Sequence, residues 1–216
     1  MNAVDRWLKR FWVNQRANVA VLLNRNDAAI DCYRELLALN PRDEVARSTL
    51  GNLLMERGDT AGATEAFEQL VAINPGNAEG WFNLGYVYEQ GERLADAERC
   101  FRRAVQLQPS LDRAWYGLGL ALIRFGRLRE AVEVLKKNTE LQPFSPYGFY
   151  QLAMTRHHLG ESAEAWRIHE KLKSFEPRYA ATLKRDMENT PPRGEAASCS
   201  PPRSEPNERE AIASAQ

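Results

Sequence analysis

Residues 81–88 read WFNLGYVY, and this stretch decides the fold. If it is helical, each residue turns the chain by about 100°, so Trp81 and Tyr88 lie on one face. Phe82 and Tyr86 then lie on a second face, about 120° away. A helix needs one apolar face to join a core. The second aromatic face therefore requires a separate explanation.

The stretch belongs to a repeat of 34 residues. Prolines mark this period along most of the chain, at Pro41, Pro75, Pro109, Pro143 and Pro177. With each proline set as position 32, the units begin at residues 10, 44, 78, 112 and 146, and position 20 is alanine in all five. A fixed period of this length is the signature of a stacked repeat array.

Small and large residues recur at fixed positions of the unit. Glycine or alanine at positions 8 and 20 lets two antiparallel helices approach closely, and large residues at positions 4, 7, 11 and 24 fill the space around them. Gly58, Gly126 and Gly160 at position 15 permit the positive φ that ends the first helix, and Asn24 can take the same role. Proline at position 32 stops the second helix. Each unit is therefore predicted to be a helix pair.

The unit resembles the tetratricopeptide repeat. The resemblance rests on a W-x2-L-G-x2-Y motif and on the positions that follow it: Trp81, Leu84, Gly85, Tyr88, Ala97, Phe101 and Pro109. It implies an all-α solenoid of antiparallel helix pairs over residues 10–177, with units 10–43, 44–77, 78–111, 112–145 and 146–177. The first unit departs from the motif, because Arg16 stands at the leucine position and Ala20 at the tyrosine position.

Three segments flank the array. Residues 178–189 are predicted to form a capping helix, which solenoids need at their ends. Residues 190–216 are rich in proline and poor in large apolar residues, so they predict a disordered tail. Residues 1–9 predict an amphipathic helical extension.

This extension begins an apolar stripe that includes Trp7, Leu8, Phe11 and Trp12. On one unbroken helix the stripe lies about 180° from Val13, which belongs to the core face of the first unit. Either the helix breaks before Val13, or the first unit does not bury the stripe. Three contacts remain open for it: a membrane surface, a second copy of the chain, and another element of the same chain.

Composition narrows the class of protein. The net charge is zero, from 29 basic and 29 acidic residues, which disfavours a nucleic-acid partner. Three cysteines without a C-x-x-C pair are a poor disulfide framework and favour a reducing compartment. The chain has no apolar run of the roughly 18 residues that a membrane span needs, and no signal-peptide pattern. We expect a cytoplasmic protein.

No residue pattern predicts catalysis, a metal site or a cofactor. Cys32 and Cys100 both occupy position 23 of their units, where cysteine acts as a small apolar residue. His157 is expected to face the groove, whereas His169 occupies the packing position 24. A nucleophile–base arrangement and a glycine-rich phosphate loop are both lacking.

The resemblance supplies an explanation for the second aromatic face. In this family the first helix of each unit lines a concave surface, with positions 2, 5, 9 and 12 in the groove. These positions and one neighbour at the edge give the candidate peptide-binding residues Asn52, Phe82, Asn83, Tyr86, Arg113, Tyr116, Tyr147 and Tyr150. Aromatic rings with a polar tip suit a peptide interface, and asparagine amides suit a peptide backbone. The alternative is that these residues only pack on neighbouring helices.

The leading interpretation is a non-catalytic adaptor that binds a peptide or protein segment in this groove. One alternative is a self-assembling or membrane-peripheral scaffold that acts through Trp7, Leu8, Phe11 and Trp12. Another is an accessory subunit of a glycosyl- or methyltransferase. The sequence predicts a protein partner and no nucleic acid, disfavours a membrane, and leaves a homo-oligomer open.

Overall fold

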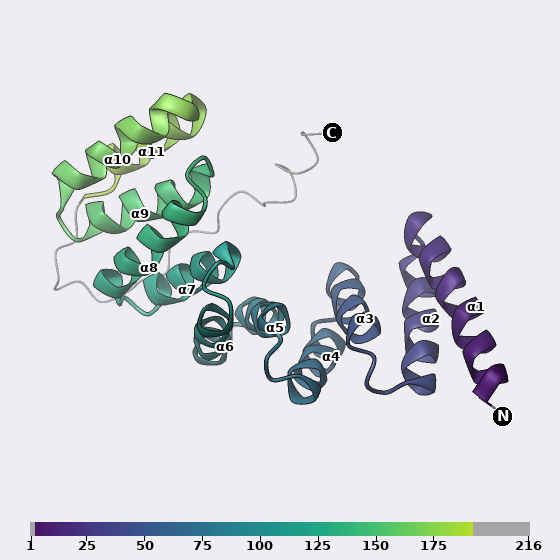
Figure 1. The fold of residues 1–216 in the computed structure, drawn as a ribbon. Coiled ribbons are helices and arrows are strands. Elements are labelled where there is room, and N and C mark those ends of the chain that lie inside the picture. The colour runs from purple at the N-terminus through teal and green to yellow at the C-terminus, as the bar shows by residue number, and fades with distance from the viewer. Residues whose placement is uncertain (1–2, 192–216) are drawn as a thin grey trace.

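The structure, a computed structural model, describes residues 3–191, with side chains from residue 4 onward. This part of the chain forms eleven α-helices and no strand (Figure 1). They are α1 (Ala3–Leu22), α2 (Asn26–Leu39), α3 (Glu44–Glu56), α4 (Thr60–Ile73), α5 (Ala78–Gln90), α6 (Leu94–Leu107), α7 (Asp112–Arg124), α8 (Leu128–Leu141), α9 (Pro146–His158), α10 (Ser162–Phe175) and α11 (Pro177–Asn189). The predicted all-α solenoid is confirmed. The predicted disordered tail lies, from residue 192 on, outside the described residues, as does Cys199.

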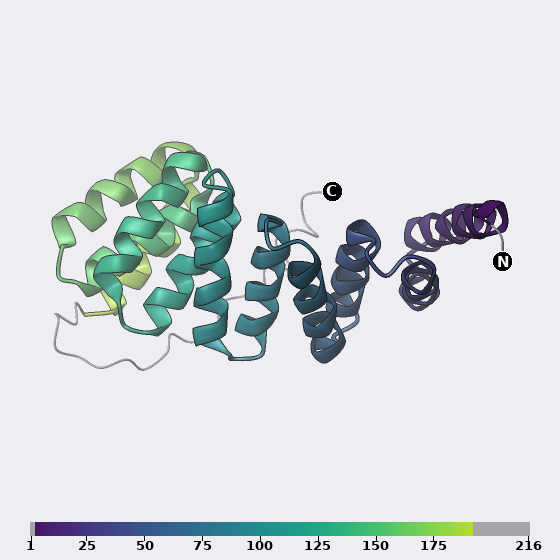
Figure 2. The ribbon, with the colours of Figure 1, turned by 60° about the horizontal axis from the view of Figure 1, so that its bottom comes forward.

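Successive helices form pairs that stack side by side into a curved array (Figures 1 and 2). The pair α1 and α2 lies at one end, and α9, α10 and α11 lie at the other. The odd-numbered helices from α1 to α9 are the first helices of the five units. Helix α11 packs on α9 and α10 through Ala180, Leu183 and Met187, which are buried. No described helix combines the length and the apolar character that a bilayer crossing requires.

The turn inside each unit has a residue with positive φ. As predicted, Gly58, Gly126 and Gly160 have φ values of 82°, 73° and 82°, and Asn24 has a φ of 53°. The third unit has Glu92 at this position, with a φ of 57°. A side chain in this region costs about 1–2 kcal/mol, and asparagine is one of the few residues that adopt it routinely, so Glu92 is the most strained residue at this position.

Position 24 forms the centre of the core. Phe67, Phe101 and Leu135 are fully buried there. A Cβ atom added to Gly85 would lie 2.8 Å from the Phe101 ring, and one added to Gly119 would lie 2.6 Å from Leu135. Glycine at position 8 therefore permits the close helix approach that the repeat pattern predicted.

Position 4 ties the second, third and fourth units to the proline turn before each of them. The Trp81 indole N–H donates to the Pro75 carbonyl at 3.0 Å, and that of Trp115 donates to Pro109 at 2.8 Å. Arg47 takes the place of tryptophan in the second unit, and its guanidinium donates to the Pro41 carbonyl at 2.6 Å. Arginine thus keeps the hydrogen bond to the proline carbonyl that tryptophan makes in the next two units, although the two side chains differ in shape.

Helix α1 is unbroken from Ala3 to Leu22, so of the two alternatives the break before Val13 is wrong, and the first unit leaves the stripe unburied. Val13 and Ala17 are buried against the array. The stripe residues Trp7, Leu8, Phe11 and Trp12 are all exposed. The alternative that another element of the same chain covers the stripe is therefore also wrong for the described residues. The reason is geometric: the two faces lie on opposite sides of one straight helix.

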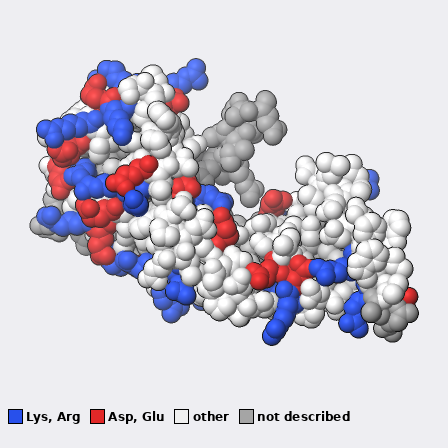
Figure 3. All heavy atoms as spheres, viewed as in Figure 1, with Lys and Arg blue, Asp and Glu red and all other residues white. Residues whose placement is uncertain are grey.

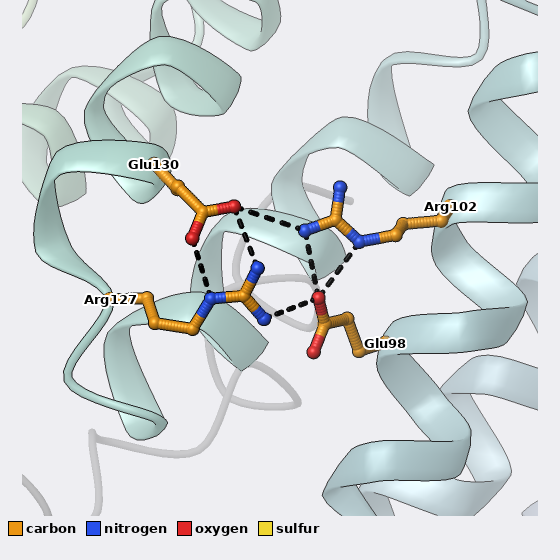
Figure 4. Close-up of polar contacts among 4 residues, drawn as sticks. All are labelled: Glu98, Arg102, Arg127 and Glu130. Atoms are coloured by element: carbon orange, nitrogen blue, oxygen red, sulfur yellow. Dashed lines mark hydrogen bonds and ion pairs between the residues drawn. The ribbon is translucent and has the colours of Figure 1, made fainter.

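An ion-pair network links the third and fourth units (Figure 4). Arg127, in the turn before α8, contacts Glu98 of α6 at 2.7 Å and Glu130 of α8 at 2.6 Å. Arg102 of α6 also reaches Glu130, at 3.3 Å. The hydrogen bond from Arg127 lowers the pKa of the Glu130 carboxyl. Exposed pairs of this kind contribute little individually, but the network crosses a boundary between units.

Candidate functional site

A groove of about 740 Å³ is lined mainly by α5, α7 and the start of α9. Five of the eight predicted groove residues line it: Phe82, Tyr86, Arg113, Tyr116 and Tyr147. The lining also includes Glu89, Glu92, Asp112, Leu120, Arg124 and Asn138. The first helices of three consecutive units therefore converge on one hollow.

The aromatic side chains of the groove differ in exposure. Tyr86 and Tyr147 are 36% and 37% exposed, whereas Tyr116 is half-buried. Phe82 is half-buried and packs on the core residue Phe101, with ring centroids 6.0 Å apart. Phe82 is therefore partly a core residue beneath the groove, and Tyr86, Tyr116 and Tyr147 contribute to its lining.

Arg113 is held across α5 and α7. Its guanidinium contacts both carboxylate oxygens of Glu79, at 2.9 and 3.1 Å. The same guanidinium lies over the Phe82 ring, 4.8 Å from its centroid, which is a cation–π distance. These contacts fix a positive charge at the rim of the groove beside an aromatic ring.

Asn138, which the sequence analysis missed, adds a polar group to the groove. It is 4% exposed, and its amide nitrogen donates to the Asp112 carbonyl at 3.0 Å. Within the described residues, the Asn138 side chain makes this one hydrogen bond, through its nitrogen. Its amide oxygen can therefore accept a hydrogen bond from a ligand in the groove. A Cβ atom on Gly148 would collide with that oxygen, so the glycine makes room for it.

The repeat register was the signal that could have identified Asn138. Position 27 carries Leu36, Leu70, Ala104 and Leu172 in the other four units, and all of them are buried and apolar. A buried amide costs free energy unless it is hydrogen-bonded, so a polar residue at an otherwise apolar position indicates a specific use.

The other predicted groove residues are not part of this lining. Asn52 is exposed on α3, and Asn83 is half-buried on α5. The Tyr150 hydroxyl donates to the Asp186 carboxylate of α11 at 2.7 Å. Trp7, Leu8, Phe11 and Trp12 belong to α1, at the opposite end of the array from α9.

The cysteines and histidines have structural surroundings. Cys32 and Cys100 are buried, and burial raises the pKa of the Cys100 thiol to about 12. His157 contacts the Thr190 carbonyl at 2.6 Å, and His169 packs on the Trp166 ring. Within residues 3–191, no three His, Cys, Asp or Glu side chains gather closely enough to hold a metal ion.

Comparison with known proteins agrees with the architecture. Sequence profiles described as tetratricopeptide repeat match residues 13–43, 48–112 and 89–146, which together exceed half of the chain. A search of curated proteins gave no match.

Solved structures share the fold at low sequence identity. A crystal structure of MamA superposes with a TM-score of 0.73 and 22% identity, over 80% of this chain and 94% of that one. MamA from Desulfovibrio magneticus RS-1 gives 0.71 and 18%, over 82% and 96%. YrrB, described as a tetratricopeptide repeat protein with an unusual peptide-binding site, gives 0.68 and 24%, over 78% and 88%. The matched profiles and the five helix pairs together establish that the chain belongs to the tetratricopeptide repeat family.

Proposed function

We propose that the groove between α5, α7 and α9 binds a peptide segment of a partner protein, and that the chain is a non-catalytic adaptor. Family membership supports a protein-interaction scaffold in general. The observation that carries the finer proposal is the convergence of three tyrosines on one concave surface, from three successive units.

The chemistry of the groove suits a peptide better than a small apolar ligand. Tyrosine offers a large contact area with few rotatable bonds and one hydrogen-bonding end. Charges of both signs surround the rings, since Glu89 and Asp112 share the lining with Arg113 and Arg124. The peptide-binding site named in the description of YrrB is a precedent on a similar fold.

The test uses a library of displayed random peptides selected on the wild-type chain. The strongest peptide is then titrated against Tyr86→Ala/Tyr116→Ala by fluorescence anisotropy. Each tyrosine is expected to contribute about 1.4 kcal/mol, so the double variant should bind roughly 100-fold more weakly.

The matched control is Trp7→Ala/Phe11→Ala, which also removes two exposed aromatic rings but outside the groove. This control should bind the peptide as wild type does. Circular dichroism establishes that both variants are folded. Equal affinities for the groove variant and the control would contradict the proposal.

A further inference from the structure

The face of α1 that points away from α2 exposes apolar side chains from its first turn to its last, with polar Gln15 and Asn18 among them in its second half. We call it the α1 stripe, and it consists of Val4, Trp7, Leu8, Phe11, Trp12, Val19 and Leu22. Trp7 and Trp12 are 63% and 64% exposed, and Leu22 is 84% exposed. Figure 3 shows a mainly uncharged surface over α1, whereas charged side chains crowd the other end of the molecule. Contiguous apolar surface of this kind marks an interaction site.

The repeat register shows what kind of face this is. Position 3 of a unit contacts the second helix of the preceding unit. In the third unit this residue is Gly80, which lies against Leu70 and Val71 of α4. Position 10 lies on the same side of the helix, two turns later. Both positions are buried in units two to five, but in the first unit they are the exposed Trp12 and Val19. The α1 stripe therefore includes a stacking face that a helix covers elsewhere in the array.

The charges beside the stripe favour a protein over a lipid surface. Three of the four basic side chains of α1 are paired within the chain. Lys9 and Arg16 contact Glu35 at 3.1 and 3.6 Å, and Arg10 contacts Asp43 at 2.6 Å. Membrane-surface helices use such cations to reach anionic headgroups, and here they point toward α2 and α3 instead.

The stripe is complementary to itself when two copies run antiparallel. Its first half carries the rings of Trp7, Phe11 and Trp12. Its second half is smaller, with Val19 and Leu22 beside polar Gln15 and Asn18. An antiparallel pair centred near Val13 places the large half of each helix over the small half of the other. Such pairing lets the side chains interdigitate, as helix packing requires.

The area of the stripe agrees with a weak, reversible contact between two copies. Partly exposed aromatic rings and aliphatic side chains of the stripe supply about 500 Å² per copy, or roughly 1,000 Å² for two copies. This is less than the roughly 1,200–2,000 Å² of standard specific interfaces and falls among weak, transient contacts, so we expect a reversible dimer with micromolar affinity.

We propose that the α1 stripe pairs with the α1 stripe of a second copy, antiparallel about a two-fold axis. The pairing is independent of the groove, which uses α5, α7 and α9. The dimer therefore has two peptide-binding grooves, one in each copy, on either side of the paired α1 helices. An isologous contact of this kind closes on itself and forms no filament.

Sedimentation equilibrium of the full chain tests the pairing. Wild type at tens of micromolar should have close to twice the monomer mass of 24.6 kDa. Trp7→Glu/Phe11→Glu should have the monomer mass, because it buries two charges in the contact. Val45→Glu is the control, since Val45 is exposed and apolar but belongs to α3 and lies outside the stripe. It should remain dimeric.

Spin labels test the orientation, in a chain whose Cys199 is replaced by serine. Cysteines introduced at Asn14 and at Val21 label one edge of the stripe. Antiparallel pairing predicts a short distance between the two Asn14 labels, and an extra separation of about 21 Å along the helix for the Val21 labels. Parallel pairing gives two similar distances and would overturn the proposal.

Three further outcomes would overturn it as well. Two of them are a monomeric wild type and a Trp7→Glu/Phe11→Glu variant that stays dimeric. The third is binding of the monomer to phosphatidylcholine or phosphatidylglycerol vesicles that the same variant abolishes, which would make the occupant of the stripe a membrane. Circular dichroism controls for folding in each case.

Discussion

Two surfaces of this molecule expose aromatic side chains, and they differ in what surrounds the rings. In the groove, Tyr86 and Tyr147 are little more than one third exposed, and charged side chains share the lining. In the α1 stripe, Trp7 and Trp12 are more exposed, and both contact the Phe11 ring. A concave surface with polar partners suits the recognition of a polar chain, whereas a bare convex stripe suits association with another apolar face.

The two surfaces also rest on different cores. Beneath the groove lie large side chains, with Phe101 fully buried between Gly85 and Gly117. Beneath the α1 stripe lie Val13 and Ala17, which bury far less area. The stability of a solenoid is nearly a sum over units and their neighbouring contacts. A substitution that unfolds the helices of the groove should therefore leave the α1 stripe folded, and the reverse should also hold.

Phe101→Ala should have the largest effect on stability, and it should disrupt the groove without disrupting the α1 stripe. Removal of this buried ring should cost about 3–5 kcal/mol and open a cavity below Phe82 and Gly117. We expect loss of peptide binding, while α1 and α2 stay helical and the mass stays that of the dimer. Hydrogen exchange measured helix by helix checks this. Uniform loss of protection from α1 to α11 would show instead that the array unfolds as one unit.

Asn138→Leu tests whether the polar lining of the groove contributes to peptide binding. Leucine fits the site, because the second unit already packs Leu70 against Gly80 as the fourth packs Asn138 against Gly148. If the amide oxygen accepts a hydrogen bond from the peptide, the variant should lose about 2 kcal/mol of binding, roughly 30-fold. Its melting temperature should not fall, because no buried polar group is left unpaired.

Calorimetry and peptide titration of Asn138→Leu separate the two roles. A lower melting temperature with unchanged affinity would mean that the amide serves only the packing of α8. Leu70→Asn is the reciprocal control, and it should lower stability without any effect on the groove.

The sequence predicted the fold and most of the groove because both follow from a period. Once 34 residues are recognised as the unit, helix geometry places Phe82 and Tyr86 on a second face, and the resemblance to the tetratricopeptide repeat implies that this face, with Tyr116, is concave. Asn138 was missed because the groove was assigned to first helices, while this residue reaches it from a second helix, α8. A comparison of every register position would have found it.

Other features depend on contacts that no period specifies. Arg47 replaces tryptophan yet keeps the bond to a proline carbonyl, which is a matter of reach rather than of residue class. The hydrogen bond from Tyr150 to Asp186 depends on how α11 settles on α9. The exposure of the α1 stripe likewise follows from the absence of a covering helix in the described residues, and residue types alone do not reveal it.

Tyr88→Phe tests a tyrosine whose hydroxyl is already used. Burial, and next the hydrogen bond from its hydroxyl to Glu68 at 2.5 Å, together raise the pKa of Tyr88 from 10.0 to about 12. The folded state thus keeps the phenol proton to a higher pH than the unfolded state. Its contribution to stability is complete below pH 10 and is lost as the pH rises toward 12.

Urea unfolding at several pH values measures this contribution. Wild type should exceed Tyr88→Phe by roughly 1–2 kcal/mol below pH 10, and the difference should shrink above it. Tyr147→Phe, which alters an exposed ring of the groove, is the control. A difference between wild type and Tyr88→Phe that stays constant with pH would assign the whole effect to packing.

Glu92→Gly should give the smallest effect, and it concerns the turn beside the groove. Relief of the positive φ gains about 1–2 kcal/mol, but glycine gives back about 0.5–1 kcal/mol through the entropy of the unfolded chain. The net gain of about 0.5 kcal/mol corresponds to a rise in melting temperature of roughly 1–2 °C. Glu92→Gln controls for the lost charge. Gly160→Ala, whose φ is 82° and whose added Cβ would meet no atom within 4 Å, should shift the temperature the opposite way. If Glu92→Gly and Glu92→Gln both lower the melting temperature, relief of strain at Glu92 does not control the stability of this turn. The Glu92 carboxylate then stabilises the end of α5 instead.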